Sequence, residues 1–161
     1  MEPGMSIARY FGMLEVLICF LLGSDTPNAQ RSAQNRLETA TSVKCEFPLY
    51  ATGTWTNGEP QAEVKTAKLS LGFDSIDTQG GTARNLGRFG NSDIVVRLSQ
   101  GSLHFMLVGS SGPLYITTVF DKESRAGKLK AVHTRHEYTD VSLPGFTSRP
   151  EQYYGECEVE H

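Results

Sequence analysis

The sequence predicts an all-β fold, an antiparallel up-and-down meander of about eight strands that closes into a small barrel, with a β-sandwich as the alternative. Three observations predict it. From Val43 onward, apolar and polar residues alternate with a period of two, as expected of half-buried strands. Turn-forming residues interrupt these stretches at short intervals, and no segment after residue 42 has helical periodicity. An up-and-down barrel of about eight strands also closes on a small interior.

The N-terminal segment differs from the rest of the chain. Phe11 to Gly23 is an apolar run of 13 residues, whereas about 20 are needed to span a bilayer. We therefore expect residues 1–29 to be a secretory signal peptide, with Arg9 as its positive charge. A retained membrane anchor and a buried N-terminal helix are the alternatives. The mature protein is expected to have no stable membrane span.

The predicted domain boundaries follow from this change of pattern. Residues 30–42 contain Leu37 as their only large apolar residue, which indicates a flexible linker or at most one helical turn. The β-domain should cover residues 43–161. Its first strand runs from Val43 toward Trp55, with a bend after Pro48, and Asn57-Gly58 then predicts a tight hairpin turn. Further strands are expected over residues 63–76, 82–86, 94–98, 103–107, 114–120, 129–136 and 153–159.

Two cysteines lie near the ends of the predicted domain. Cys19 lies in the apolar leader, whereas Cys45 and Cys157 fall on the apolar faces of the first and last strands. A disulfide between them would join the strands that close the barrel, and in the chain-entropy model it contributes on the order of 4 kcal/mol. Such a bond places the protein in an oxidising compartment, periplasmic or extracellular. Two buried thiols are the alternative.

Composition and motifs argue against several classes of function. The formal charge of −3 gives no electrostatic footprint for nucleic acid. His133 and His136 are three residues apart in a predicted strand, so they should face opposite ways and not share a metal ion. The GSSG sequence at 109–112 lacks the strand-to-helix context of a nucleophile elbow, and no nucleotide-binding loop occurs. We therefore expect that the protein is not an enzyme and that it binds neither a cofactor nor a metal ion.

Arg135 and His133 are the most informative polar pair. By alternation they share a face with Leu129 and Ala131, which places them toward the barrel interior. A buried guanidinium needs a partner, so the pair is either a structural contact at one end of the barrel or an anion or carboxylate site inside it. The candidate ligand pocket comprises Arg135, His133, Tyr115, Trp55 and Tyr153.

Gly53-Thr54-Trp55 resembles the G-x-W signature of lipocalin-like barrels. In that family the tryptophan packs at the barrel base beneath an arginine from the last strands, so the resemblance implies that Trp55 packs against Arg135. Here, however, the tryptophan lies near the end of the first strand, whereas the family has it near the start.

A wider resemblance is to short exported bacterial proteins of unknown function. It rests on TTVF at 117–120, AVHTRH at 131–136 and PEQYYGEC at 150–157. It implies export and a shared fold, and it brings no activity.

These observations favour an exported, non-enzymatic barrel that binds a small apolar or amphipathic ligand, or a partner protein. A structural or protein-interaction module of the cell envelope, with a filled barrel and no ligand, is the second hypothesis, and an enzyme is the third. An open interior beside Arg135 would favour ligand binding. An interior packed by Phe73, Phe105, Phe120 and Trp55 would favour the filled module.

Overall fold

The computed structural model describes residues 36–87, 90–109, 112–137 and 149–161. The expected signal peptide, residues 1–29, lies outside these ranges. Across the described ranges, no helix is long and apolar enough to cross a membrane. The strands are β1 (Ser42–Thr56), β2 (Glu59–Asp77), β3 (Thr82–Gly87), β4 (Gly90–Ser99), β5 (Ser102–Val108), β6 (Leu114–Glu123), β7 (Leu129–His136) and β8 (Glu151–Glu160).

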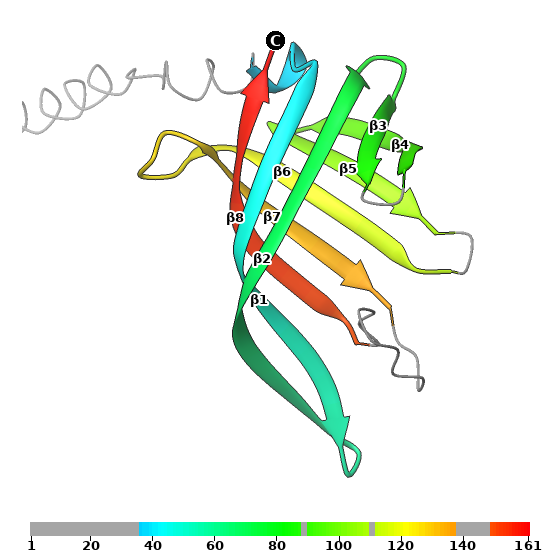
Figure 1. Ribbon diagram of the computed structural model, residues 1–161, viewed down its shortest axis with the longest axis vertical. Helices are drawn as coiled ribbons and strands as arrows, with labels where there is room; N and C mark the ends of the chain where they lie inside the picture. The colour runs from blue at the N-terminus through cyan, green and yellow to red at the C-terminus, as the bar shows by residue number, and fades with distance from the viewer. Residues whose placement is uncertain (1–35, 88–89, 110–111, 138–148) are drawn as a thin grey trace, which may run out of the picture.

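The eight strands form one antiparallel meander that closes on itself (Figure 1). Each strand pairs with its neighbour in the sequence, and β1 also pairs with β8. The prediction of an all-β barrel is therefore confirmed, and the sheet is not split into the two layers of a sandwich. Closure leaves no unpaired first and last strands, which in an open sheet would be exposed to other chains.

Side-chain alternation decides what fills the barrel. In β1, Val43, Cys45 and Phe47 are buried, whereas Lys44 and Glu46 between them are exposed. The same alternation in the other strands brings Phe73 and Phe105 face to face, with ring centroids 4.0 Å apart. The most deeply buried side chains, all under 2 % exposed, are Phe47, Phe105, Leu37, Leu103, Leu129, Val43, Val96, Val119, Cys45 and Cys157. Burial of these apolar groups is the main favourable contribution to folding.

A disulfide joins Cys45 of β1 to Cys157 of β8. The two residues lie directly opposite each other in the β1–β8 pairing, with both side chains inside the barrel. The predicted bond is therefore present, and it links the two strands whose pairing closes the sheet.

Residues 36–42 pack against the barrel end where β8 finishes. Leu37 is fully buried and Ala40 nearly so. The Thr41 amide donates a 2.9 Å hydrogen bond to the Glu160 carbonyl, and Arg36 forms an ion pair with Glu123. Residues 36–38 form one short helical turn, which the sequence allowed as the alternative to a flexible linker, and Leu37 in this turn packs against the barrel core.

The β1–β2 hairpin extends well beyond the other strands (Figure 1). Asn57 and Gly58 both have positive φ, 54° and 84°, as the predicted two-residue turn requires. The β1–β2 register shifts between Phe47 and Leu49, at the expected bend. The hairpin extends past Thr52, the last residue of β1 that pairs with β8, and every residue from 59 to 66 is exposed. We call residues 49–66 the hairpin arm.

Candidate functional site

Arg135 faces the barrel interior, as its place in the alternation predicted. Leu129, Ala131 and His133 precede it on the same face of β7 and are buried. Its guanidinium carbon lies 5.4 Å from the ring centroid of Tyr153 and 5.9 Å from that of Tyr115. The cation is thus held between two aromatic rings at one end of the core, an arrangement stabilised by cation–π attraction.

Glu151 is the anionic partner of Arg135. The two residues are cross-strand neighbours on β7 and β8, and an Arg135 Nη1 lies 3.6 Å from Glu151 Oε2. The Tyr153 hydroxyl donates a 2.5 Å hydrogen bond to the same carboxylate oxygen. Burial, together with this hydrogen bond, raises the pKa of Tyr153. Glu151 is only 6 % exposed, so the pair satisfies the rule that buried charges are neutralised.

Glu151 was not predicted as a site residue, because the sequence assigned this position to the irregular segment before the last strand. The structure begins β8 at Glu151 itself. Extending the alternation of β8 by one step, from Tyr153 back to Glu151, would have placed this carboxylate on the inner face beside Arg135.

His133 is a core residue and not an accessible ligand or base. It is 5 % exposed, and its Nδ1 lies 2.8 Å from the hydroxyl of Thr117, which is also buried. The rings of Phe47 and Tyr153 surround it at centroid distances of 6.0 and 5.8 Å. Burial, with a smaller contribution from the nearby Arg135 cation, lowers the pKa of His133 to about 4. The imidazole is therefore neutral at physiological pH.

The structure brings Arg135, His133, Tyr115 and Tyr153 together and leaves Trp55 apart. Pairing between β1 and β8 ends at Thr52–Glu151, so Trp55 lies three residues further out, near the tip of the hairpin arm. It is 55 % exposed. Trp55 is therefore neither part of the packed core nor the residue beneath Arg135, and on both points the expectation is wrong. The rings of Tyr115 and Tyr153 lie against the Arg135 guanidinium instead.

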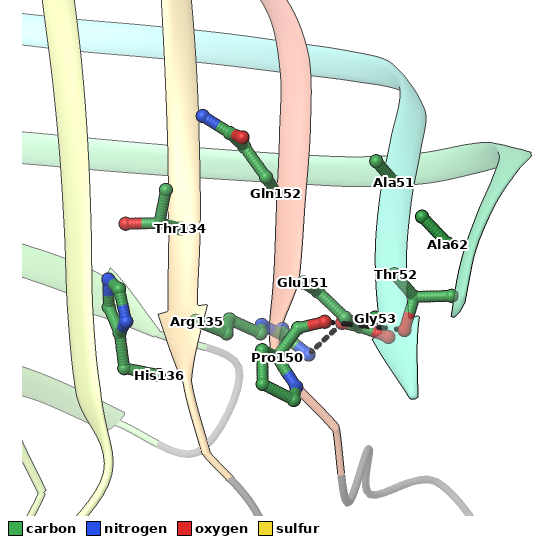
Figure 2. Close-up of a pocket in the computed structure, with 10 residues that line it drawn as sticks. All are labelled: Ala51, Thr52, Gly53, Ala62, Thr134, Arg135, His136, Pro150, Glu151 and Gln152. Atoms are coloured by element: carbon green, nitrogen blue, oxygen red, sulfur yellow. Dashed lines mark hydrogen bonds and ion pairs between the residues drawn. The ribbon is translucent and has the colours of Figure 1, made fainter. Parts of the chain in front are cut away.

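A groove of about 390 Å³ lies where the hairpin arm meets the ends of β7 and β8 (Figure 2). Thr134 and Gln152 are cross-strand partners on its wall. Alternation points them away from His133 and Tyr153, so this wall lies on the outer face. Arg135 and Glu151 of the inner face border the groove as well. The Pro150 carbonyl accepts hydrogen bonds from the Gly53 amide (3.1 Å) and the Thr52 hydroxyl (3.3 Å). The lining residues are Ala51, Thr52, Gly53, Ala62, Thr134, Arg135, His136, Pro150, Glu151 and Gln152.

The groove has a small-residue surface with polar groups beside it. Ala51, Gly53 and Ala62 are neighbours on β1 and β2, since Gly53 pairs with Ala62 and Ala51 precedes it on the same face. A Cβ added to Gly53 would meet no atom within 4 Å, so space remains above it. Thr134, His136 and Gln152 add hydrogen-bonding groups from the neighbouring strands. This combination suits a compact molecule with one apolar and one polar part.

His133 is buried and His136 exposed on opposite faces of β7, as predicted. Within the described ranges, no group of three or more His, Cys, Asp or Glu side chains could hold a metal ion. The Thr117–His133 pair has the residue types of a nucleophile and a base, and both side chains are buried. The serines of the GSSG sequence, at 110 and 111, lie outside the described residues.

Comparison of the chain with protein-family models, with curated proteins and with solved structures finds no match.

Proposed function

We propose that this protein is an exported, non-enzymatic barrel that binds a small amphipathic ligand in the groove between the hairpin arm and strands β7 and β8. The observation that carries the proposal is the groove itself, about 390 Å³ in volume. That volume falls within the range of small-molecule sites, about 300–1,000 Å³.

The lining of the groove suggests how such a ligand would lie. Its apolar part would cover Ala51, Gly53 and Ala62, where the absence of larger side chains leaves space. Its polar part would reach the hydrogen-bonding groups of the adjoining strands, Thr134, His136 and Gln152. The ligand would therefore bind outside the barrel, because the interior is occupied by side chains such as Phe47 and Phe105.

Export is supported by two independent features. The Cys45–Cys157 disulfide is typical of proteins that fold in an oxidising compartment, such as the periplasm or the extracellular space. The apolar run between Phe11 and Gly23 has the length of a signal-peptide core and is too short for an ordinary membrane span.

A second candidate is a structural or interaction module of the cell envelope that has no small ligand. The dense core favours it: Phe73 and Phe105 stack at 4.0 Å, and Leu37 closes the barrel end. On this view the groove is only a by-product of the bend in β1.

Thermal shift measurements with Gly53→Leu distinguish the two candidates. The probes are octanoate, octylamine and octyl glucoside, which share a chain and differ in the charge of the head group. If the groove binds an amphipath, at least one probe raises the Tm of the wild type but not of Gly53→Leu, whose side chain fills the groove. Thr82→Leu, at an exposed position of β3, is the control and should respond like the wild type. Equal responses of wild type and Gly53→Leu, or none to any probe, contradict the ligand proposal.

A further inference from the structure

Strand β2 has a long free edge. It pairs with β1 along the whole hairpin, from Glu59 to Phe73, but its pairing with β3 begins only at Gly72. Among the described residues, no strand pairs with the second edge of β2 over positions 59–71. The hairpin arm projects from the barrel with this edge along its outer side (Figure 1). Unpaired backbone groups along such an edge can accept a further strand.

The outer face of the hairpin arm also exposes apolar side chains. Val64 is 67 % exposed, and Leu49 and Trp55 are 39 % and 55 % exposed. Val64 pairs with Ala51, and alternation from there places Leu49 and Trp55 on the same face of the sheet. Exposure of these apolar side chains to water is unfavourable, and an added strand would cover part of Val64.

The charges on this edge match those of a second copy in one register. Two identical antiparallel strands related by a twofold axis place each residue opposite another on the same face. With the axis at Val64, Glu63 faces the partner's Lys65 and Lys65 faces the partner's Glu63, while the two valines meet on the other face. Moving the axis by one residue, to Lys65 or to Glu63, would instead bring identical charges together, which is destabilising.

We propose that two copies of the chain associate through the β2 edges, so that their hairpin arms form one four-stranded sheet centred on Val64. A lysine on an edge strand ordinarily discourages pairing. Here Lys65 is already ion-paired with Glu63 of its own strand, so the edge presents a short pattern of alternating charge. That pattern disfavours the two registers centred on Glu63 and Lys65 and fits its own copy in the register centred on Val64.

Charge exchange tests the proposal with the full chain. Glu63→Lys and Lys65→Glu each place like charges opposite each other at both contacts, so each should weaken dimerisation about tenfold or more in sedimentation equilibrium. The double variant Glu63→Lys/Lys65→Glu restores opposite charges and should dimerise like the wild type. An equimolar mixture of the two single variants should form a heterodimer, because every contact in it is complementary. Since these side chains are exposed, the variants should fold normally, which far-ultraviolet circular dichroism checks.

Three results would overturn the proposal: a wild type that stays monomeric up to high micromolar concentration, a dimer insensitive to both single changes, or single variants that fail to associate when mixed.

A cross-link locates the axis independently. In a Cys19→Ser background, Val64→Cys should yield a covalent dimer on mild oxidation, because directly opposed residues of antiparallel strands have Cα atoms about 4.5–5.5 Å apart. Val108→Cys is the control, at a strand position equally exposed at 69 %. It should remain monomeric. Equal cross-linking of both variants would mean random collision and would contradict the assigned register.

Discussion

Replacing Arg135 with methionine should destabilise the protein more than the loss of an ordinary surface ion pair would. The change leaves the Glu151 carboxylate in place, with its side chain only 5 % exposed, and removes the Arg135 guanidinium that lay 3.6 Å from it. Removing one partner of a fully buried pair costs about 3–5 kcal/mol. Since the Arg135 side chain is 27 % exposed, solvent screens part of this interaction, and we expect a loss of about 2 kcal/mol.

Urea denaturation of three variants tests this reasoning. Arg135→Met/Glu151→Gln removes both charges and keeps an acceptor for the Tyr153 hydroxyl, so it should be less destabilised than Arg135→Met alone. Arg84→Met is the control: its bonds to Asp74 are shorter, 2.7 and 2.8 Å, but the side chain is 45 % exposed. It should shift the midpoint little. If Arg84→Met costs as much as Arg135→Met, or if the double variant is the least stable, burial is not what makes this ion pair important.

Three further predictions concern the interior and the barrel seam. Replacing Cys45 and Cys157 with alanine should lower the free energy of unfolding by about 4 kcal/mol; denaturation midpoints that match the wild type would contradict this. Burial holds the pKa of His133 near 4, against 6.5 in the unfolded chain, so between these pH values only the unfolded state binds the proton. The free energy of unfolding should therefore decrease as the pH is lowered from about 6.5 to about 4, by on the order of 3 kcal/mol. His133→Gln should flatten that profile, and an unchanged profile would show that other groups cause it. Gly155→Ala should lower the free energy of unfolding by about 3 kcal/mol or more, because a Cβ there would lie 2.0 Å from a backbone oxygen of β1. The control Gly53→Ala has open space around the added Cβ and should be nearly neutral. Similar melting temperatures for the two variants would refute the clash.

The alternation of apolar and polar residues was enough to predict most of the architecture. It assigned the strands, placed Cys45 and Cys157 on facing inner positions, and turned Arg135 inward while His136 pointed out. These properties depend on the alternation of side-chain direction along a strand, which has a period of two residues, and the tertiary contacts agree with it. The Asn57-Gly58 turn was predictable for the same reason, since its backbone conformation depends on the two residues themselves.

The features that were missed depend on contacts distant in sequence. Leu37 showed no periodic pattern, yet it fills the end of a core built by strands far along the chain. Trp55 was given an interior role because the sequence does not reveal that β1 continues past its last partner on β8. The groove follows from the bend of the hairpin arm and was not predictable from residue types, because Ala51, Gly53 and Ala62 are unremarkable on their own.

We propose that this protein binds a small amphipathic molecule on the outside of a filled barrel. The most direct measurement is a titration followed by amide chemical shifts in the ¹⁵N-labelled protein, using the octyl probe that gives the largest thermal shift, or octanoate if none does. We expect saturable shifts at Gly53, Thr134 and Gln152, with little change at Val96 and Leu103 in the core. Shifts concentrated in the core, or no saturable shifts at the groove, would contradict it.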